Sequence, residues 1–131
     1  MEHEIKTARP DEFVNITGIV RLEVEKSGIR DGIAVVFIPH TTAGVTINEN
    51  ADPDVVYDIL SGLGKVFPEN GGYRHTEGNS HAHIKASLMG SSCTVPIENG
   101  ILMLGTWQGI YFCEFDGPRI RKIQIRIMGD C

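Results

Sequence analysis

The sequence of residues 99–129 is NGILMLGTWQGIYFCEFDGPRIRKIQIRIMG, and this stretch decides the fold. It is rich in β-branched and aromatic residues and is divided by glycines, a composition typical of strands joined by tight turns. Within it, Ile110 and Phe112 alternate onto the same strand face as two carboxylates, those of Glu114 and Asp116. The opposite face is apolar. The strand is therefore expected to be covered on both sides, with both carboxylates where water is scarce.

The dipeptide Gly117-Pro118 predicts the two-residue turn of a hairpin, because glycine tolerates a positive φ and proline has a fixed one. The resulting register pairs Asp116 with Arg119. It also pairs Glu114 with Arg121. Buried carboxylates need such partners, since an unpaired one would protonate or destabilise the fold. The four residues thus predict either two structural ion pairs or part of an active-site cluster.

Length and composition limit the architecture and the partners. A chain of 131 residues with 41% hydrophobic residues predicts one domain, residues 1–131, with its own core. A net charge of -5 disfavours nucleic acid and anionic membranes as main partners. Residues 1–10, MEHEIKTARP, contain no apolar signal core, no apolar run reaches membrane length, and the three cysteines form no C-x-x-C pair. A cytoplasmic protein with reduced thiols is the expectation.

Hydrophobic periodicity and turn residues predict the order of elements. The expected strands are residues 3–8, 33–38, 44–47, 93–97, 101–108 and 110–116. One helix is expected to begin at an Asn15 N-cap and stop at Ser27-Gly28, and another to begin at Asp52-Pro53 and end at Gly62 and Gly64. Residues 67–79 are expected as a functional or mobile loop, and residues 80–89 fit a helix or a strand. The fold class predicted is α+β: a single compact domain, mainly an antiparallel β-sheet or sandwich, with two or three helices.

Four histidines, His40, His75, His81 and His83, lie at strand ends or in polar segments and suggest a metal site. A catalytic zinc ion takes three protein ligands and a water, and imidazole is its usual nitrogen donor. His81 and His83 would share a face on a strand but not on a helix. The alternatives are ordinary surface or core histidines, or imidazoles that bind an anionic substrate directly.

Specific motifs resemble the YjbQ-type family, whose members are named secondary thiamine-phosphate synthases. The motifs are His40-Thr-Thr-Ala-Gly44, Asn48-Glu49 with Asp52-Pro53, Arg74-His75-Thr-Glu-Gly-Asn79 with Ala82-His83, Gly105-Thr-Trp-Gln-Gly-Ile110, and Glu114-Phe-Asp-Gly-Pro-Arg119. The resemblance runs from about residue 15 to the C-terminus. It implies a compact α+β domain, a homotrimer and a polar pocket lined by the motif residues.

The resemblance also implies roles for individual residues. The metal ligands are expected to be His40, His75 and His83, with His81 ranked below them. The catalytic residues are expected to be Glu49, Asp52, Glu114, Asp116 and Arg119. The substrate-binding residues are expected to be Thr42, Asn48, Asn79, Lys85, Trp107 and Gln108. Asp52 is expected to cap its helix in any case.

The implied activity is a thiamine-phosphate-synthase-like transfer on a phosphorylated heteroaromatic small molecule. The word "secondary" in the family's name suggests that this is a side activity. Trp107 would stack the ring, and a divalent metal, zinc or Mg²⁺, would serve as cofactor. A histidine site favours zinc, whereas Mg²⁺ prefers oxygen ligands. Metal-dependent hydrolysis of a small phosphorylated metabolite is therefore an alternative, and a non-enzymatic metabolite-binding protein is another.

Overall fold

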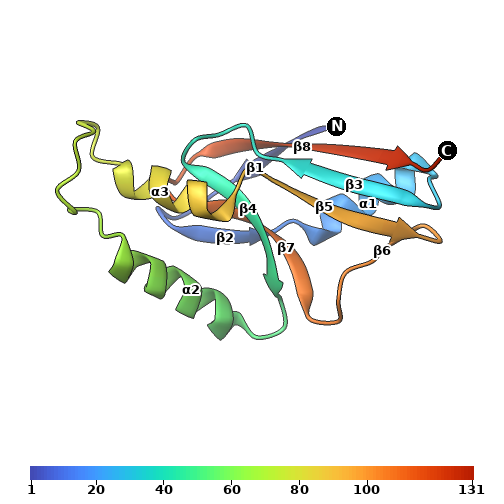
Figure 1. The fold of residues 1–131 in the computed structure, drawn as a ribbon, viewed down its shortest axis with the longest axis horizontal. Helices are drawn as coiled ribbons and strands as arrows, with labels where there is room; N and C mark the ends of the chain where they lie inside the picture. The colour runs from blue at the N-terminus through green and yellow to red at the C-terminus, as the bar shows by residue number, and fades with distance from the viewer.

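Two antiparallel β-sheets face each other across the main hydrophobic core in the computed structural model, which describes residues 1–131 (Figure 1). The elements in chain order are β1 (Glu2–Lys6), β2 (Glu12–Asn15), α1 (Thr17–Ser27), β3 (Gly32–Phe37), β4 (Ala43–Glu49), α2 (Pro53–Val66), α3 (Ser80–Met89), β5 (Ser92–Glu98), β6 (Ile101–Leu102), β7 (Gln108–Glu114) and β8 (Ile120–Gly129). The larger sheet has the order β1-β8-β3-β5-β6 and the smaller β2-β7-β4. The α+β prediction is confirmed. No helix is long and apolar enough to cross a membrane.

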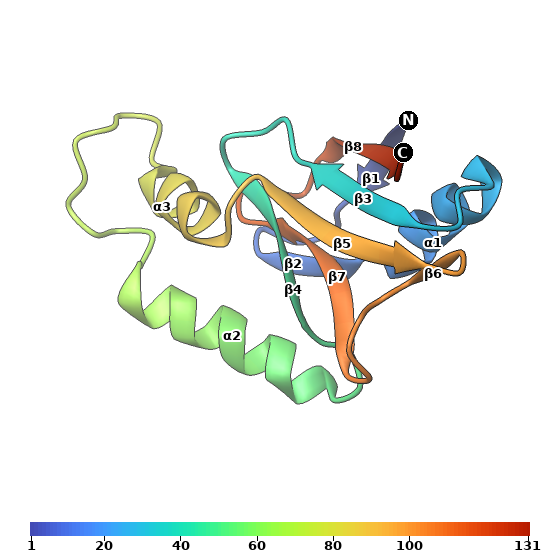
Figure 2. The same cartoon turned by 45° about the vertical axis from the view of Figure 1, so that its right-hand side comes forward.

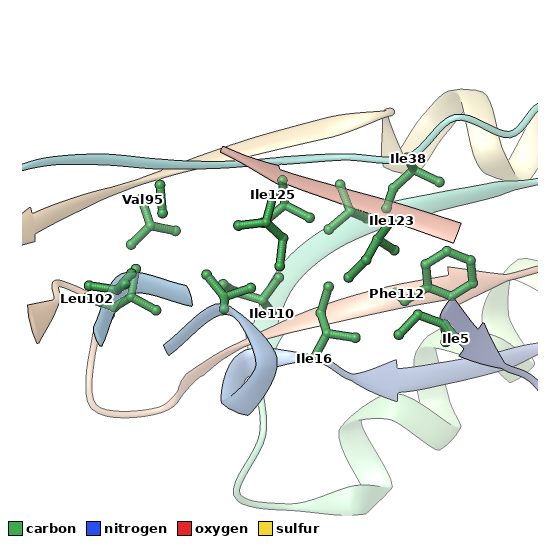
Figure 3. Close-up of a cluster of buried hydrophobic side chains, with 14 of the residues drawn as sticks. Ile5, Ile16, Ile38, Val95, Leu102, Ile110, Phe112, Ile123 and Ile125 are labelled. Carbon is green, nitrogen blue, oxygen red and sulfur yellow. The ribbon is translucent and has the colours of Figure 1, made fainter. Parts of the chain in front are cut away.

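The core lies between the sheets and is closed by α1. Ile110 and Phe112 of β7 point toward Ile123 and Ile125 of β8 (Figure 3). On the other face of β7, Tyr111, Cys113 and Phe115 form a second cluster with α3. Strand β7 is thus buried on both sides, as its sequence predicts, and each large side chain buried in this way stabilises the fold by roughly 1.5–3 kcal/mol.

The predicted hairpin at Gly117-Pro118 is wrong, because β7 and β8 belong to different sheets. Strand β7 pairs with β2 and β4, whereas β8 pairs with β1 and β3. The N-terminal segment supplies one strand to each sheet, and its crossing runs beside the crossing from β7 to β8. The amide of Thr7 donates to the Arg119 carbonyl at 2.9 Å, and the amide of Gly117 donates to the Pro10 carbonyl at 3.1 Å. This corner joins the two sheets.

The β5–β6 hairpin is confirmed, with Asn99 at φ 52° and Gly100 at φ 76° in its turn. Both residues need a positive φ, which is why an Asn-Gly pair suits this connection. The expected strand 101–108 ends early, however, at Leu102. A tight turn follows, in which the amide of Gln108 donates to the Gly105 carbonyl at 3.1 Å.

The helices differ from the prediction mainly at their ends. Helix α1 begins after Ile16, and Asn15 belongs to β2, a strand that the sequence analysis missed. Its end at Gly28 is confirmed, with φ 69° there. Helix α2 begins as predicted, with the Asp52 carboxylate accepting the Asp54 amide at 2.9 Å.

Helix α2 continues through its two glycines to Val66 instead of ending at them. Residues 80–89, undecided from sequence, form α3. Helix α2 lies at the edge of the molecule, joined to α3 by the long loop (Figure 2).

Candidate functional site

A polar cleft of about 710 Å³ opens beside the corner where β7 crosses to β8. Its walls come from the β3–β4 connection, the loop before α3, the first turns of α3 and the corner itself. Of the residues predicted for a site, seven line it: His40, Thr42, His75, Asn79, His83, Asp116 and Arg119. Segments far apart in sequence therefore converge here.

The floor of the cleft rests on a buried ion pair between Glu114 and Arg121, whose side chains are 0% and 5% exposed. Arg121 Nε donates to both carboxylate oxygens, at 2.8 and 3.1 Å, and Nη2 donates to the same carboxylate. The Thr7 hydroxyl donates to the carboxylate at 2.7 Å, and the amides of Phe115 and Asp116 donate at 3.1 Å each.

These contacts fix the charge of Glu114. Burial alone would raise its pKa, but the hydrogen bonds from Arg121 and Thr7 outweigh burial, so the pKa is lowered. A carboxylate with no exposed surface and this many donors is poorly placed to take a proton from a substrate. Its evident role is to hold Arg121, whose Nη2 also donates to the Thr42 hydroxyl at 2.8 Å.

A second ion pair lies at the mouth of the cleft. Arg119 Nη2 donates to Asp116 Oδ2 at 2.9 Å, and its Nε donates to the Asp116 carbonyl at 2.8 Å. Asn79 Nδ2 donates to the same Oδ2 at 3.0 Å, which leaves Asn79 Oδ1 buried without a partner. Both predicted arginine pairings are confirmed, although the predicted hairpin is not their cause.

The two arginines keep hydrogen-bonding capacity for a ligand. The Nη1 groups of Arg119 and Arg121 make no hydrogen bond within the chain, and both residues line the cleft. Because guanidinium groups bind phosphate and carboxylate oxygens well, this corner has the chemistry of an anion-binding site. The sequence analysis selected Arg119, but not Arg121, as a catalytic residue. The signal for it was an arginine on the apolar face that also carries Ile123 and Ile125.

The three predicted metal ligands are only partly brought together. The His75 and His83 rings lie edge to face with centroids 5.4 Å apart. Two imidazoles on one tetrahedral zinc ion have a centroid separation of roughly 5 Å, so the spacing of this pair suits a shared ion and equally suits edge-to-face ring packing. His40 Nε2, in contrast, accepts the Lys122 amide at 2.9 Å. Burial and the charge of Arg121 lower the His40 pKa.

No group of three or more His, Cys, Asp or Glu side chains is arranged to hold a metal ion. The three-ligand set therefore stays a prediction, of which the structure assembles two members. Glu77 comes within 3.9 Å of His75 Nε2 and was not among the predicted site residues. His81 does not line the cleft, as a helical α3 requires when His83 does.

The remaining predicted site residues lie elsewhere in the chain. Five of them, Asn48, Glu49, Asp52, Trp107 and Gln108, lie at or beyond the far end of the β4–β7 ladder, where Glu49 is opposite Gln108. The near end of that ladder pairs Ala43 with Glu114, so seven residues of strand, roughly 20 Å, separate these side chains from the corner. Trp107 is 63% exposed. Lys85 is buried and donates to Asp11 at 2.7 Å.

Comparison with known proteins places this fold and its motifs in a family. The sequence model described as "UPF0047 protein YjbQ-like" matches residues 1–130. A UPF0047 protein of Methanocaldococcus jannaschii is 52% identical over 129 residues, covering 98% of this chain and 94% of the relative. The UPF0047 protein YugU of Bacillus subtilis is 54% identical over 127 residues, with 96% of both chains covered.

Solved structures agree with these matches. A YjbQ/UPF0047 family protein of Clostridium acetobutylicum superposes with a TM-score of 0.97 at 65% identity, over 98% of this chain and 99% of that one. A protein of Sulfolobus solfataricus, described as YbjQ-like and of unknown function, superposes with a TM-score of 0.95 at 37% identity, over 99% and 96% of the two chains.

Proposed function

Because the chain belongs to the YjbQ-like UPF0047 family, we propose that it carries the activity its resemblance implies, a thiamine-phosphate-synthase-like transfer on a phosphorylated small molecule. The observation that carries this proposal is the pair of guanidinium groups, Arg119 and Arg121, with free Nη1 atoms in one cleft beside His40. Such a cluster suits the charge of a phosphate or pyrophosphate group.

In this reaction a thiazole nitrogen forms a bond to the methylene carbon of an activated pyrimidine. The bond from that carbon to pyrophosphate breaks, and the bonding electrons leave with the pyrophosphate. Arg119 and Arg121 would hold the leaving group and stabilise its developing charge. Asp116 and Asn79 orient Arg119, whereas Glu114 fixes Arg121 and is not the base. The Asn79 Oδ1 atom lacks a partner and would accept a hydrogen bond from a substrate N–H or O–H.

A divalent metal would add shielding of phosphate charge, and the residues best placed to hold one are His75 and His83. The Thr42 hydroxyl already accepts a hydrogen bond from Arg121. Its main role would therefore be to orient the guanidinium group, and not to bind the substrate. Hydrolysis of a phosphorylated metabolite is the second candidate. The imidazole pair favours it, because imidazoles bind zinc-like ions, which activate water, whereas the Mg²⁺ ion of a pyrophosphate site prefers oxygen ligands.

The test is an assay with pyrimidine pyrophosphate, thiazole phosphate and Mg²⁺, in which thiamine phosphate, pyrophosphate and orthophosphate are each measured. The transfer predicts equal amounts of thiamine phosphate and pyrophosphate, with formation lowered at least tenfold by Arg119→Ala. Arg126→Ala, on the exposed side of β8, is the matched control and should keep the rate. Orthophosphate release without coupling would favour the hydrolase. Ligand binding with product formed at the uncatalysed rate would refute both reactions and leave a metabolite-binding protein.

We also propose that the chain acts as a homotrimer. Strands β6 and β4 end their sheets with unpaired edges. Ile101 in β6, and Met103 and Trp107 in the segment after it, have exposed apolar side chains. Natural proteins cover such edges with other elements or with subunits. Light scattering that gave the 14.4 kDa mass of one chain at micromolar concentration would refute the assembly.

A further inference from the structure

A second hollow, of about 480 Å³, adjoins the cleft on the side of α3. It is lined by Tyr73, Arg74, His75, Ser80, His83 and Ile84. Two of these residues, His75 and His83, also line the cleft, so the paired imidazoles form a wall that the two spaces share. A ligand in the cleft that reached past these rings would enter the second hollow.

The second hollow differs chemically from the cleft. Besides Arg74 and Ser80, its walls are Tyr73, Ile84 and the paired imidazoles, and neither Arg119 nor Arg121 lines it. Aromatic and aliphatic walls bind an uncharged group by removing its apolar surface from water. Because ring faces favour stacked or edge-to-face neighbours, a planar ring fits these walls better than a flexible chain.

The position of Tyr73 is built into the loop before α3. Its hydroxyl donates to the Pro68 carbonyl at 3.0 Å, which folds the loop back on itself. Its ring lies so close to Gly71 that a Cβ atom at that position would overlap it. Glycine at 71 therefore allows the ring to rest on the backbone, and the hydrogen bond holds it there.

We propose that this second hollow is a subsite for the aromatic or heteroaromatic ring of a ligand whose phosphate binds Arg119 and Arg121 in the cleft. The inference rests on the anion site of the proposed function and adds the place where the ring of an aryl or arylmethyl phosphate would bind. It gives ring binding to Tyr73 and Ile84, which the sequence analysis did not select. Trp107, selected for that role, lies at the other end of the β4–β7 ladder in the same chain.

The test compares two probes, benzyl phosphate and methyl phosphate, by calorimetry on the full chain. We expect benzyl phosphate to bind at least about tenfold more tightly, because the ring loses its contact with water in the subsite. Tyr73→Ala and Ile84→Ser should each remove most of that preference and leave the methyl phosphate affinity within about twofold. Tyr73→Phe keeps the ring and should keep the preference. Tyr57→Ala, an exposed tyrosine of α2, is the matched control and should change neither affinity.

The outcomes separate the subsite from the anion site. Equal affinity for the two probes in the unmutated protein would overturn the subsite, and so would a preference that survives both Tyr73→Ala and Ile84→Ser. Arg119→Ala should weaken the binding of both probes to a similar extent, whereas a substitution in the subsite should weaken only the binding of benzyl phosphate. No binding of either phosphate would overturn the anion site of the proposed function, and the subsite with it. Far-ultraviolet circular dichroism identifies any variant that fails to fold. If one of Tyr73→Ala and Ile84→Ser does not fold, the other one tests the subsite.

Discussion

Replacing Glu114 by glutamine removes the anion beneath the candidate cleft while keeping the shape of the side chain. The amide would present a donor to a site in which Arg121, Thr7 and two backbone amides all donate. At least one of these donors would lose its acceptor, and the guanidinium of Arg121 would stay buried without its counter-charge. Breaking one partner of a buried pair in this way typically costs about 3–5 kcal/mol. A domain of this size is stable by about 5–15 kcal/mol in total.

The control comes from the other ion pair of the same corner. Asp116 and Arg119 have side chains that are 26% and 52% exposed, so water screens their interaction. Asp116→Asn should therefore cost no more than about 1 kcal/mol. Urea unfolding of the two variants and the unmutated chain measures both losses, with similar slopes required for a direct comparison of midpoints.

The pH dependence gives a second reading of the same interaction. The folded pKa of Glu114 is lowered below its ordinary value of 4.5, so its stabilising contribution is present above pH 4.5 and is lost as the pH falls through the folded pKa. The difference in free energy of unfolding between the unmutated protein and Glu114→Gln should therefore shrink below pH 4.5.

Two results would refute this reasoning. One is a loss for Glu114→Gln no larger than that for Asp116→Asn. The other is a difference between the unmutated protein and the variant that stays constant from neutral to acid pH. The double variant Glu114→Leu with Arg121→Met should recover most of the loss, because it removes both buried charges.

Three further predictions concern thiols, packing and metal. At pH 8 a disulfide reagent should modify one thiol per native chain, the exposed Cys131, because burial raises the pKa of Cys93 to about 11; rapid modification of all three would contradict this. Gly44→Ala should cost about 1–3 kcal/mol, since a Cβ there would lie 2.7 Å from a backbone oxygen that follows α3, whereas Gly62→Ala in α2 meets no atom within 4 Å and should be neutral or stabilising. Elemental analysis of protein purified without chelator should find a divalent ion that His83→Ala loses; unchanged metal in the variant would remove that residue from the ligand set.

The sequence predicts the fold best where a pattern is long or chemically specific. The apolar run at 33–38, the Asp52 cap and the Asn99-Gly100 turn all depend on local geometry, and all are confirmed. Strand β2 was missed because its four residues precede a helical pattern that includes their neighbour Ile16. The hairpin error arose because local turn chemistry cannot show that the N-terminal segment supplies a strand to both sheets.

The candidate site follows the same rule. The arginine pairings were predicted from the register of a hairpin that does not form, and they are present because the crossing from β7 to β8 still brings these side chains together. His75 and His83 lie beside the corner because of the way the long loop and α3 pack on the sheets. No local sequence pattern encodes that packing. Tyr73 was missed for that reason, and the Trp107 motif could not be assigned to one end of the sheet.

The pairing of the two chain ends has a consequence for the order of folding. Strand β1 pairs with β8, and β2 pairs with β7, so the first fifteen residues find their partners only after nearly the whole chain has been made. Contacts of such high sequence separation slow folding, because a large loop must close before any pairing energy is gained. During synthesis β1 and β2 would remain unpaired, strand-forming segments until β7 and β8 have been made. We expect chaperones to bind these unpaired segments, and we expect truncations before β8 to leave the larger sheet without the strand that joins β1 to β3.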